Sequence, residues 1–187
     1  VRSLEELKAV VALANRHRVS IFVMGGGSNT LVSDQGFDGV VVKIAMRQIQ
    51  IDGIRVRAEA GVLSAALARA TAKAGLGGLA WAISLPGTIG GAVRGNAGCF
   101  GGETKDRLIE VEVLRDGNII ILSKQELAFA YRESVVKHSN DIILSATFQF
   151  EPGDARELQK ELEDKLAKRK STQPLDAGSA VCLFKNY

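Results

Sequence analysis

Residues Ser84–Glu103, SLPGTIGGAVRGNAGCFGGE, hold seven of the 20 glycines of the chain within 20 residues. Each glycine inside a regular helix or strand costs about 0.5–1 kcal/mol relative to alanine, so this density disfavours ordinary secondary structure. It is typical of a backbone that takes positive φ angles or approaches a phosphate or a flat ring closely. A flexible linker is the alternative, but apolar residues such as Leu85, Ile89 and Phe100 lie between the glycines, and a linker does not need them.

The composition is that of a globular protein with a real core. Of 187 residues, 46% are hydrophobic and 24% are charged. The net charge of +3 is dispersed, except at Lys165–Lys170, where no aromatic residues interleave, so we expect no nucleic-acid partner. A mild positive balance suits a phosphorylated or carboxylate substrate. With no signal peptide and no long apolar run, we expect a cytoplasmic protein and no membrane partner.

The cysteines and histidines point away from disulfides and metals. Cys99 and Cys182 are the two cysteines, and His17 and His138 are the two histidines. Their spacing gives neither a disulfide framework nor a zinc pattern, so we expect a reduced protein without a metal site. The sequence does not fix the oligomeric state, and a monomer is the default expectation.

The N-terminal part predicts a helix followed by strands. Ser3 and Glu6 form a capping-box pattern, and apolar spacing extends the helix to about His17. Val19–Met24 is predicted as a buried strand that runs into the glycine loop Gly25–Thr30. Two further strands are predicted, at Leu31–Ser33 and Val40–Ile44.

The remainder of the chain is rich in hairpin signals. Asp52-Gly53 and Asp116-Gly117 each lie between apolar runs and predict tight hairpins. Leu63–Ala74 predicts a helix that Gly75 ends, and Ser123–Glu126 predicts a capping box that opens a short helix. Further elements are a strand at Asp141–Phe150 and an amphipathic helix at Ala155–Lys170. We therefore expect an α+β fold with two subdomains and a C-terminal helix that leads away.

Gly25–Thr30 is a candidate ligand loop because it directly follows a strand. It lacks the lysine of a phosphate-binding P-loop, and it is not a G-x-G-x-x-G, so neither an NTPase nor a Rossmann site is indicated. Its backbone N–H groups, with the Ser28 and Asn29 side chains, could still hold a pyrophosphate. Together with Pro86–Gly91, two such loops could hold a dinucleotide from opposite sides.

Arg132 and the cysteines are the candidate chemical groups. Arg132, in Tyr131–Ser134, is either an exposed cation at a helix end or a fixed guanidinium that pairs with a carboxylate or a developing enolate. Cys99 is best explained as a buried, inert thiol. Cys182 has polar neighbours, and a thiol with a pKa of about 8.5 is a far better proton donor than a serine hydroxyl.

Four motifs occur in the order and spacing of one family. They are Met24–Asp34 (MGGGSNTLVSD), Ser84–Glu103, Tyr131–Ser134 (YRES) and Gln173–Asn186 (QP…CLFKN). On these motifs the chain resembles the UDP-N-acetylenolpyruvoylglucosamine reductases. These flavoenzymes of bacterial peptidoglycan synthesis belong to the vanillyl-alcohol-oxidase-type FAD-binding superfamily. The resemblance covers essentially all 187 residues.

The resemblance implies a domain organisation. It implies an FAD-binding domain of two α+β subdomains, residues 1–45 and 46–152, with FAD held non-covalently between them. Residues 153–187 would then be a linking helix and the start of a substrate domain. NADPH is implied as hydride donor and a UDP-sugar as substrate. Compared with the family, the chain looks truncated at both ends, without the domain that carries a catalytic glutamate, so we expect FAD binding and leave its own turnover open.

The resemblance also implies site residues. Arg132 matches the catalytic arginine and Cys182 the proton donor, with Ser179 as rival donor. Tyr131, Lys170 and Asn186 are the implied substrate-binding residues. The implied cofactor-binding residues are Gly25, Gly26, Gly27, Ser28, Asn29, Thr30, Pro86, Gly87, Thr88, Gly90, Gly91 and Asn96. Val181 and Tyr187 depart from the family pattern, which has glycine and proline there.

Two other functions remain open from the sequence. One is an oxidase of the same superfamily that uses oxygen. Many of those bind flavin covalently through a histidine, and neither glycine loop contains one. The other is a non-catalytic flavin-binding module, which would have no reason to keep Arg132 and Cys182 together.

Overall fold

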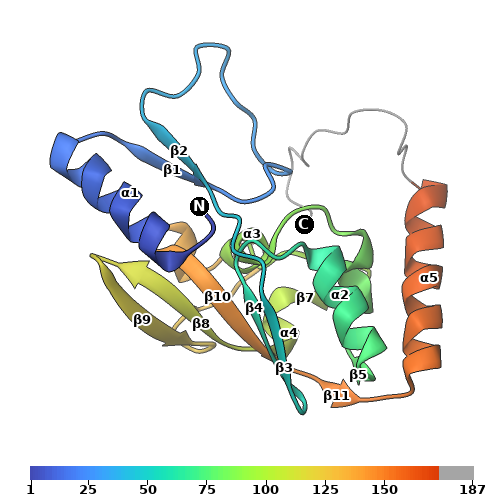
Figure 1. Cartoon of the computed structure of the whole chain (residues 1–187). Helices are drawn as coiled ribbons and strands as arrows, with labels where there is room; N and C mark the ends of the chain where they lie inside the picture. Colours follow the sequence, from blue (N-terminus) through green and yellow to red (C-terminus); the bar gives the residue numbers. More distant parts are fainter. Residues whose placement is uncertain (173–187) are drawn as a thin grey trace.

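The computed structural model describes residues 1–172, which form a five-stranded sheet and three two-stranded sheets, with helices packed among them (Figure 1). The chain opens with α1 (Leu4–His17), as predicted. Ser3 caps this helix, because its Oγ accepts the Glu6 N–H at 3.1 Å. The Glu6 carboxylate accepts the N–H of Arg2 at 2.7 Å. The reciprocal bond of the predicted capping box therefore goes to the residue before the cap.

The first sheet is small. Strands β1 (Ile21–Met24) and β2 (Val40–Lys43) pair in parallel, with Ile21 opposite Val40. The prediction of a buried first strand is wrong, because Phe22 and Val23 are each 38% exposed. Within the described residues β1 has one partner strand, so much of its surface stays uncovered. The strand predicted at Leu31–Ser33 does not form, and Leu31 is 82% exposed on the long loop that joins β1 to β2.

The second sheet has five antiparallel strands in the order β3-β4-β10-β8-β9. They are β3 (Ile49–Asp52), β4 (Arg55–Glu59), β8 (Leu108–Arg115), β9 (Asn118–Ser123) and β10 (Ile142–Gln149). The β8–β9 hairpin turns at Asp116-Gly117, as predicted, and both residues take positive φ, 49° and 80°. The β3–β4 hairpin also forms, but Asp52 pairs with Arg55. Its turn is therefore Gly53-Ile54, one residue later than predicted.

Helices pack on the larger sheet and beside it. The longer ones are α2 (Ser64–Lys73) and α5 (Ala155–Thr172), and both pack against the short 3-10 helix η1 (Ala80–Ser84). The shorter ones are α3 (Ile89–Arg94), α4 (Thr104–Arg107) and the 3-10 helix η2 (Val135–Lys137). Two small two-stranded sheets complete the fold: β6 (Gly98–Cys99) with β7 (Gly102–Glu103), and β5 (Leu76–Gly77) with β11 (Glu151–Pro152).

The helix predicted after Ser123 does not form. The capping bonds are present, since Glu126 accepts the Ser123 N–H at 2.8 Å and donates its own N–H to Ser123 Oγ at 3.3 Å. Ala128 then takes a φ of 44°, which ends the turn before a helix can propagate. Leu127 is instead completely buried, and the chain continues without a helix to Arg132.

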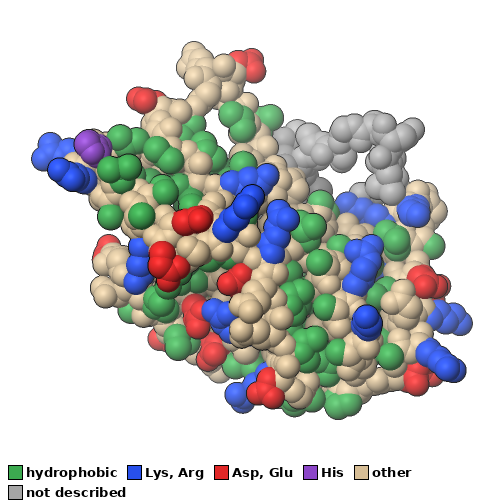
Figure 2. Space-filling model, in the orientation of Figure 1, with side chains coloured by type: hydrophobic (Ala, Val, Ile, Leu, Met, Phe, Trp, Pro, Cys, Tyr) green, Lys and Arg blue, Asp and Glu red, His purple; other side chains and the backbone are tan. Residues whose placement is uncertain are grey.

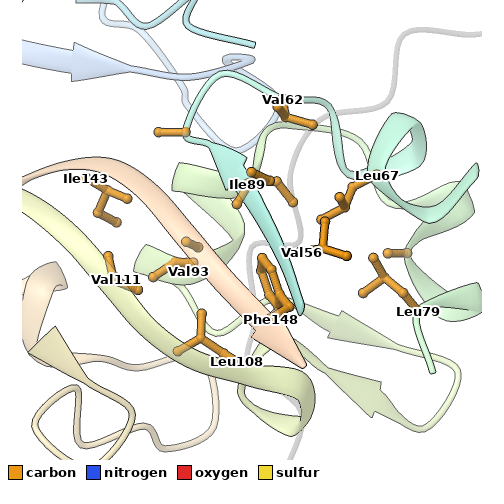
Figure 3. Packing of buried hydrophobic residues seen from close by; sticks show 14 of the residues in the cluster. Val56, Val62, Leu67, Leu79, Ile89, Val93, Leu108, Val111, Ile143 and Phe148 are labelled. Atoms are coloured by element: carbon orange, nitrogen blue, oxygen red, sulfur yellow. The ribbon is translucent and has the colours of Figure 1, made fainter. Parts of the chain in front are cut away.

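The core lies between the centre of the larger sheet and the helices (Figure 3). Strand β10 is its middle element, and Phe148 on this strand is 1% exposed. Ile89 and Val93 project from α3 into the same cluster, so α3 is held against β10. The glycine stretch is therefore packed against the buried central strand β10, and it is not a flexible linker.

The surface carries charges of both signs. In the view of Figure 2, Lys and Arg side chains are spread over several elements, with Asp and Glu side chains between them. Among residues 1–172, none of the helices combines the length and the apolar character that crossing a membrane requires.

Candidate cofactor-binding site and the Arg132 loop

The two glycine loops touch each other, although one follows strand β1 and the other joins η1 to α3. Gly25 directly follows β1, and Thr88 is the residue before α3. A Cβ on Gly25 would overlap Thr88 Oγ1, and a Cβ on Gly26 would lie 3.1 Å from Gly87 Cα. A Cβ on Gly87 would lie 2.8 Å from Ser28 Oγ, and Gly87 has a φ of 111°. A side chain on any of these glycines would displace its neighbour, which is the Thr88 hydroxyl at Gly25, the Gly87 backbone at Gly26 and the Ser28 hydroxyl at Gly87.

Backbone hydrogen bonds hold the second loop, Pro86–Gly91, against residues 60–62. Ile89 N–H donates to Val62 O at 2.8 Å, and Gly90 N–H donates to Ala60 O at 2.9 Å. A Cβ on Gly90 would lie 3.0 Å from Ala60 Cβ. The expectation that glycine density disfavours regular structure is therefore wrong for residues 89–94. A short helix forms there because its glycines allow the backbones to pack in contact.

The environment of Thr88 indicates whether the junction of the two loops fits a dinucleotide. Its side chain is 5% exposed, and its Oγ1 has no hydrogen-bond partner in the described part of the chain. A buried hydroxyl without a partner costs about 1–3 kcal/mol. Across residues 1–172, the backbone N–H groups of Gly25 to Asn29 likewise lack an acceptor. Unpaired donors along bare glycine backbone fit the oxygens of a pyrophosphate, and therefore fit FAD.

Arg132 lies at the tip of a tight loop. Ala130 and Glu133 exchange backbone hydrogen bonds of 3.2 and 3.1 Å, which leaves Tyr131 and Arg132 as the turn. Arg132 has a φ of 58°, a region that residues with side chains rarely adopt. Such an outlier supports a functional hypothesis. Arg132 lies in no helix of the structure, so the alternative of a helix-end cation is wrong.

The Arg132 guanidinium has a defined position. Its Nη2 donates to Gly98 O at 2.7 Å, and its Nη1 donates to Asn96 O at 3.3 Å. Its Cζ lies 4.8 Å from the centre of the Tyr131 ring. The predicted catalytic arginine is thus brought against the end of the glycine stretch, more than 30 residues earlier in the chain.

Asn96 joins these two segments. Its side chain is fully buried, and its Nδ2 donates to Ala130 O at 2.9 Å and to Glu103 Oε2 at 3.0 Å. Its Oδ1 accepts the Lys105 N–H at 3.1 Å. These bonds occupy the side chain with protein partners. Cofactor binding by Asn96 stays a prediction. In the structure its side chain connects the glycine stretch to the loop that carries Arg132.

Sequence reasoning missed Glu103 and Arg94. Glu103 forms an ion pair with Lys105 at 2.9 Å, and the hydrogen bond from Lys105 lowers the pKa of Glu103. Arg94 donates to Val136 O at 2.6 Å and to Lys137 O at 2.9 Å. Both side chains fasten the glycine stretch to its surroundings. The sequence signal for Glu103 was its capping box with Asp106 across the start of α4.

Helix α5 presents basic side chains to the same region. Lys165 and Lys168 place their Nζ atoms 5.8 and 5.6 Å from the centre of the Phe100 ring. The neighbouring Cys99 Sγ donates to Trp81 O at 3.2 Å. Burial raises the pKa of the Cys99 thiol, although the positive charges of Arg169 and Arg132 oppose this. A half-buried thiol with a raised pKa is a poor nucleophile, in agreement with the expectation of an inert Cys99.

Of the other predicted site residues, the structure describes two. Tyr131 is 41% exposed beside Arg132, and Lys170 is exposed in the last turn of α5. Cys182, Ser179 and Asn186 lie outside the described residues. No group of three or more His, Cys, Asp or Glu side chains suited to a metal ion occurs up to Thr172.

A family model described as an FAD binding domain matches residues 1–123. The chain belongs to this FAD-binding domain family. It is similar to curated proteins named UDP-N-acetylenolpyruvoylglucosamine reductase. The one from Caldanaerobacter subterraneus subsp. tengcongensis is 40% identical over 98% of this chain and 61% of the relative. The one from Synechococcus sp. is 40% identical over 98% of this chain and 62% of the relative. The chain thus spans about three fifths of the length of these relatives.

Among solved structures, the chain is again similar to a reductase of this name. The UDP-N-acetylenolpyruvylglucosamine reductase from Thermus caldophilus aligns with a TM-score of 0.80 at 32% identity, covering 93% of this chain and 62% of that structure. An alkyldihydroxyacetonephosphate synthase aligns with a TM-score of 0.56 at 20% identity, over 81% of this chain and 30% of that structure, which shows the fold alone. The predicted α+β FAD-binding fold of the vanillyl-alcohol-oxidase type and the resemblance to the reductases are confirmed.

Proposed function

We propose that the protein reduces UDP-N-acetylenolpyruvoylglucosamine to UDP-N-acetylmuramate in peptidoglycan synthesis, with FAD as cofactor and NADPH as hydride donor. The observation that carries this proposal is the contact of Gly25–Thr30 with Pro86–Gly91 around the unpartnered Thr88 hydroxyl, with the ordered Arg132 guanidinium against the same glycine stretch. The activity named for its relatives agrees with it.

The cofactor would lie where the two loops meet. Gly25–Thr30 and Pro86–Gly91 would donate backbone N–H groups to its pyrophosphate, and Thr88 Oγ1 would gain the partner that it lacks. We propose the corresponding division of the chain into a first subdomain, 1–45, a second subdomain, 46–152, and the linking segment, 153–187. The first loop belongs to one subdomain and the second loop to the other.

Bound FAD would supply the hydride that is added to the enolpyruvyl methylene carbon of the substrate. The electron pair of the double bond then moves toward the substrate carboxylate, and Arg132 stabilises the enolate. Because its guanidinium is already held by Gly98 O and Asn96 O, it needs little reorganisation as charge develops. Preorganised donors of this kind are worth about 3–4 kcal/mol. Cys182 then protonates the adjacent carbon, and Tyr131, Lys170 and Asn186 bind the substrate.

An absorption spectrum tests this function. The purified full-length protein is expected to show a flavin band, which NADPH bleaches and which the UDP-enolpyruvyl sugar restores in the absence of oxygen. Restoration by oxygen alone, with no response to the sugar, would instead indicate an oxidase. A colourless protein that takes up no added FAD would contradict the proposal at its first step.

A further inference from the structure

The carbonyl groups that receive the Arg132 guanidinium belong to a segment whose own N–H groups bond back to α3: Asn96 N–H donates to Val93 O at 3.1 Å and Ala97 N–H to Ala92 O at 2.8 Å. They are the carbonyls of Asn96 and Gly98, within Asn96-Ala97-Gly98. Asn96 has a φ of 40°, and Gly98 has no side chain. An acceptor pair that drifted would let the guanidinium drift with it, so every further contact that steadies this segment also steadies the guanidinium.

Residues Glu103, Thr104 and Lys105 hold it residue by residue. Glu103 pairs with Gly98 in the β6–β7 hairpin. Thr104 donates its N–H at 2.9 Å and its Oγ1 at 2.8 Å to Ala97 O. Lys105 N–H donates to Asn96 Oδ1 at 3.1 Å. Three consecutive residues thus contact three consecutive residues.

The Glu103 side chain is also linked to the Arg132 loop, and the link runs through the Asn96 side chain. Its Oε2 accepts from Asn96 Nδ2 at 3.0 Å, and the same nitrogen donates to Ala130 O, the residue at the base of the Arg132 turn. Asn96 is fully buried, so its amide orientation is set by these partners and not by water. The Lys105 ammonium, 2.9 Å from Glu103, keeps the carboxylate in place.

We propose that Glu103 is a positioning residue, which orients the Asn96 side chain and thereby fixes both the carbonyls that receive the Arg132 guanidinium and the turn that carries it. Glu103 itself makes no direct bond to Arg132 in the structure, so it acts through Asn96. The proposal rests on the proposed function for the chemical role of Arg132. The geometric part, that Glu103 immobilises the guanidinium, stands by itself.

The geometric part is tested by arginine side-chain NMR on the full-length protein labelled with 15N-arginine. Loss of one signal in Arg132→Lys assigns the Nε–H group of Arg132. We expect its heteronuclear NOE to match that of the rigid backbone in the parent, and to fall in Glu103→Ala. Glu103→Gln keeps an oxygen acceptor for Asn96 and should keep the signal rigid. A rigid Arg132 signal in Glu103→Ala would overturn the proposal.

Kinetics then test the consequence. Each variant is loaded with FAD, checked by its visible spectrum, reduced by NADPH and mixed with the UDP-enolpyruvyl sugar. In Glu103→Ala we expect reduction by NADPH within about twofold of the parent, and reoxidation by the sugar slower by about 10- to 100-fold, because a misplacement of about 1 Å can cost about 100-fold. Glu103→Gln should recover most of this rate.

A matched control is Glu151→Ala, because Glu151 also pairs with a cation, Arg107 at 2.7 Å, but lies outside this network. It should behave as the parent in both measurements. If Glu103→Ala slowed both half-reactions and weakened FAD binding alike, Glu103 would be a general structural residue and the proposal would be wrong. If the parent itself failed to respond to the sugar, the proposed function would fail, while the NMR result would still decide the positioning role.

Discussion

At the scale of single residues, Thr88 is in a costly state that we propose the cofactor relieves. Its hydroxyl is buried without a partner among residues 1–172, although a threonine elsewhere in the same fold finds one. Thr71 is 1% exposed, and its Oγ1 donates to Ala68 O at 3.1 Å. The difference suits a residue whose partner arrives with the cofactor.

Thr88→Val removes the hydroxyl and keeps the shape. We expect FAD to bind about 10-fold more weakly, which corresponds to about 1.4 kcal/mol and to one lost hydrogen bond to a charged group. Without FAD the variant should be at least as stable as the parent, because a buried, unpaired donor has been removed. Quenching of flavin fluorescence and urea unfolding measure the two effects. Thr71→Val, as control, should lose stability and keep its FAD affinity, and the same pattern in Thr88→Val would contradict the assignment.

Cys182 and Cys99 offer a matched pair for the chemistry. We expect Cys182→Ala, in the full-length protein, to be reduced by NADPH at the parent rate and to lose about 100-fold or more in substrate turnover, since general acid catalysis is worth about 10²–10⁴-fold. Cys99→Ala should keep both rates, because the Cys99 thiol is half-buried and bonded to Trp81 O. Stopped-flow absorbance follows each half-reaction. Normal turnover in Cys182→Ala would favour Ser179 as donor.

Elements differ in how far their sequences decide them. The β8–β9 hairpin follows from Asp116-Gly117, because both turn residues can take positive φ at little cost. Its outer end is also tied to the neighbouring strand. Arg115, the last residue of β8, donates to both carboxylate oxygens of Asp141, just before β10, at 2.8 and 2.7 Å. This bidentate pair links two strand ends that the backbone ladder alone would leave to fray.

The Arg115–Asp141 pair predicts a pH dependence of stability. The hydrogen bond from Arg115 lowers the pKa of Asp141 in the folded protein. Its contribution is therefore full above the ordinary aspartate pKa of about 3.9, and it is lost as the pH falls through the lowered, folded-state value. We expect Asp141→Asn to lower the free energy of unfolding by about 1–2 kcal/mol at pH 7.

Urea unfolding of parent and Asp141→Asn across pH 7 to pH 3 measures this difference. It should narrow below about pH 4, because Asp141 then takes up a proton in the unfolded parent before it does so in the folded parent. Asp116→Asn is a control on the adjacent turn, where no bidentate partner is present among the described residues. A difference for Asp141→Asn that stayed constant down to pH 3 would show that the ion pair is not its cause.

In the molecule as a whole, the glycine loops connect the small β1–β2 sheet with α3, which packs on β10 of the five-stranded sheet. Gly26 approaches Gly87 within contact distance, while β1 leaves Phe22 and Val23 well exposed. The first sheet is thus small and incompletely covered, and the second carries the main core. A ligand that binds both loops would add contacts across this junction.

We therefore expect FAD to stabilise the whole fold. A ligand that binds only the folded state at about 100 times its dissociation constant adds about 2.7 kcal/mol to the free energy of unfolding. Scanning calorimetry with increasing FAD should show a rising midpoint for the parent. Gly87→Ala should show little rise, because its Cβ would meet Ser28 Oγ. Gly117→Ala has a similar positive φ but open surroundings, and it should lose some stability yet keep the FAD response. An equal response in all three proteins would contradict binding between the loops.

Features that depend on neighbours a few residues apart could be predicted from the amino-acid sequence. Ser3 capping α1, the Asp116-Gly117 turn, Gly75 ending α2 and the amphipathic α5 were all predictable, because their energetics are local. The motif resemblance also located the two glycine loops and Arg132.

Other features depend on contacts between distant parts of the chain, so local sequence patterns did not predict them. The Ser123 capping bonds form without a helix, and the β3–β4 turn shifts to Gly53-Ile54, because the strands on either side fix where the chain must go. The link from Glu103 through Asn96 to Arg132 joins residues about 30 positions apart. No periodicity or local propensity encodes such a link. It exists because the fold brings those backbones together, and a buried amide must then find partners among them.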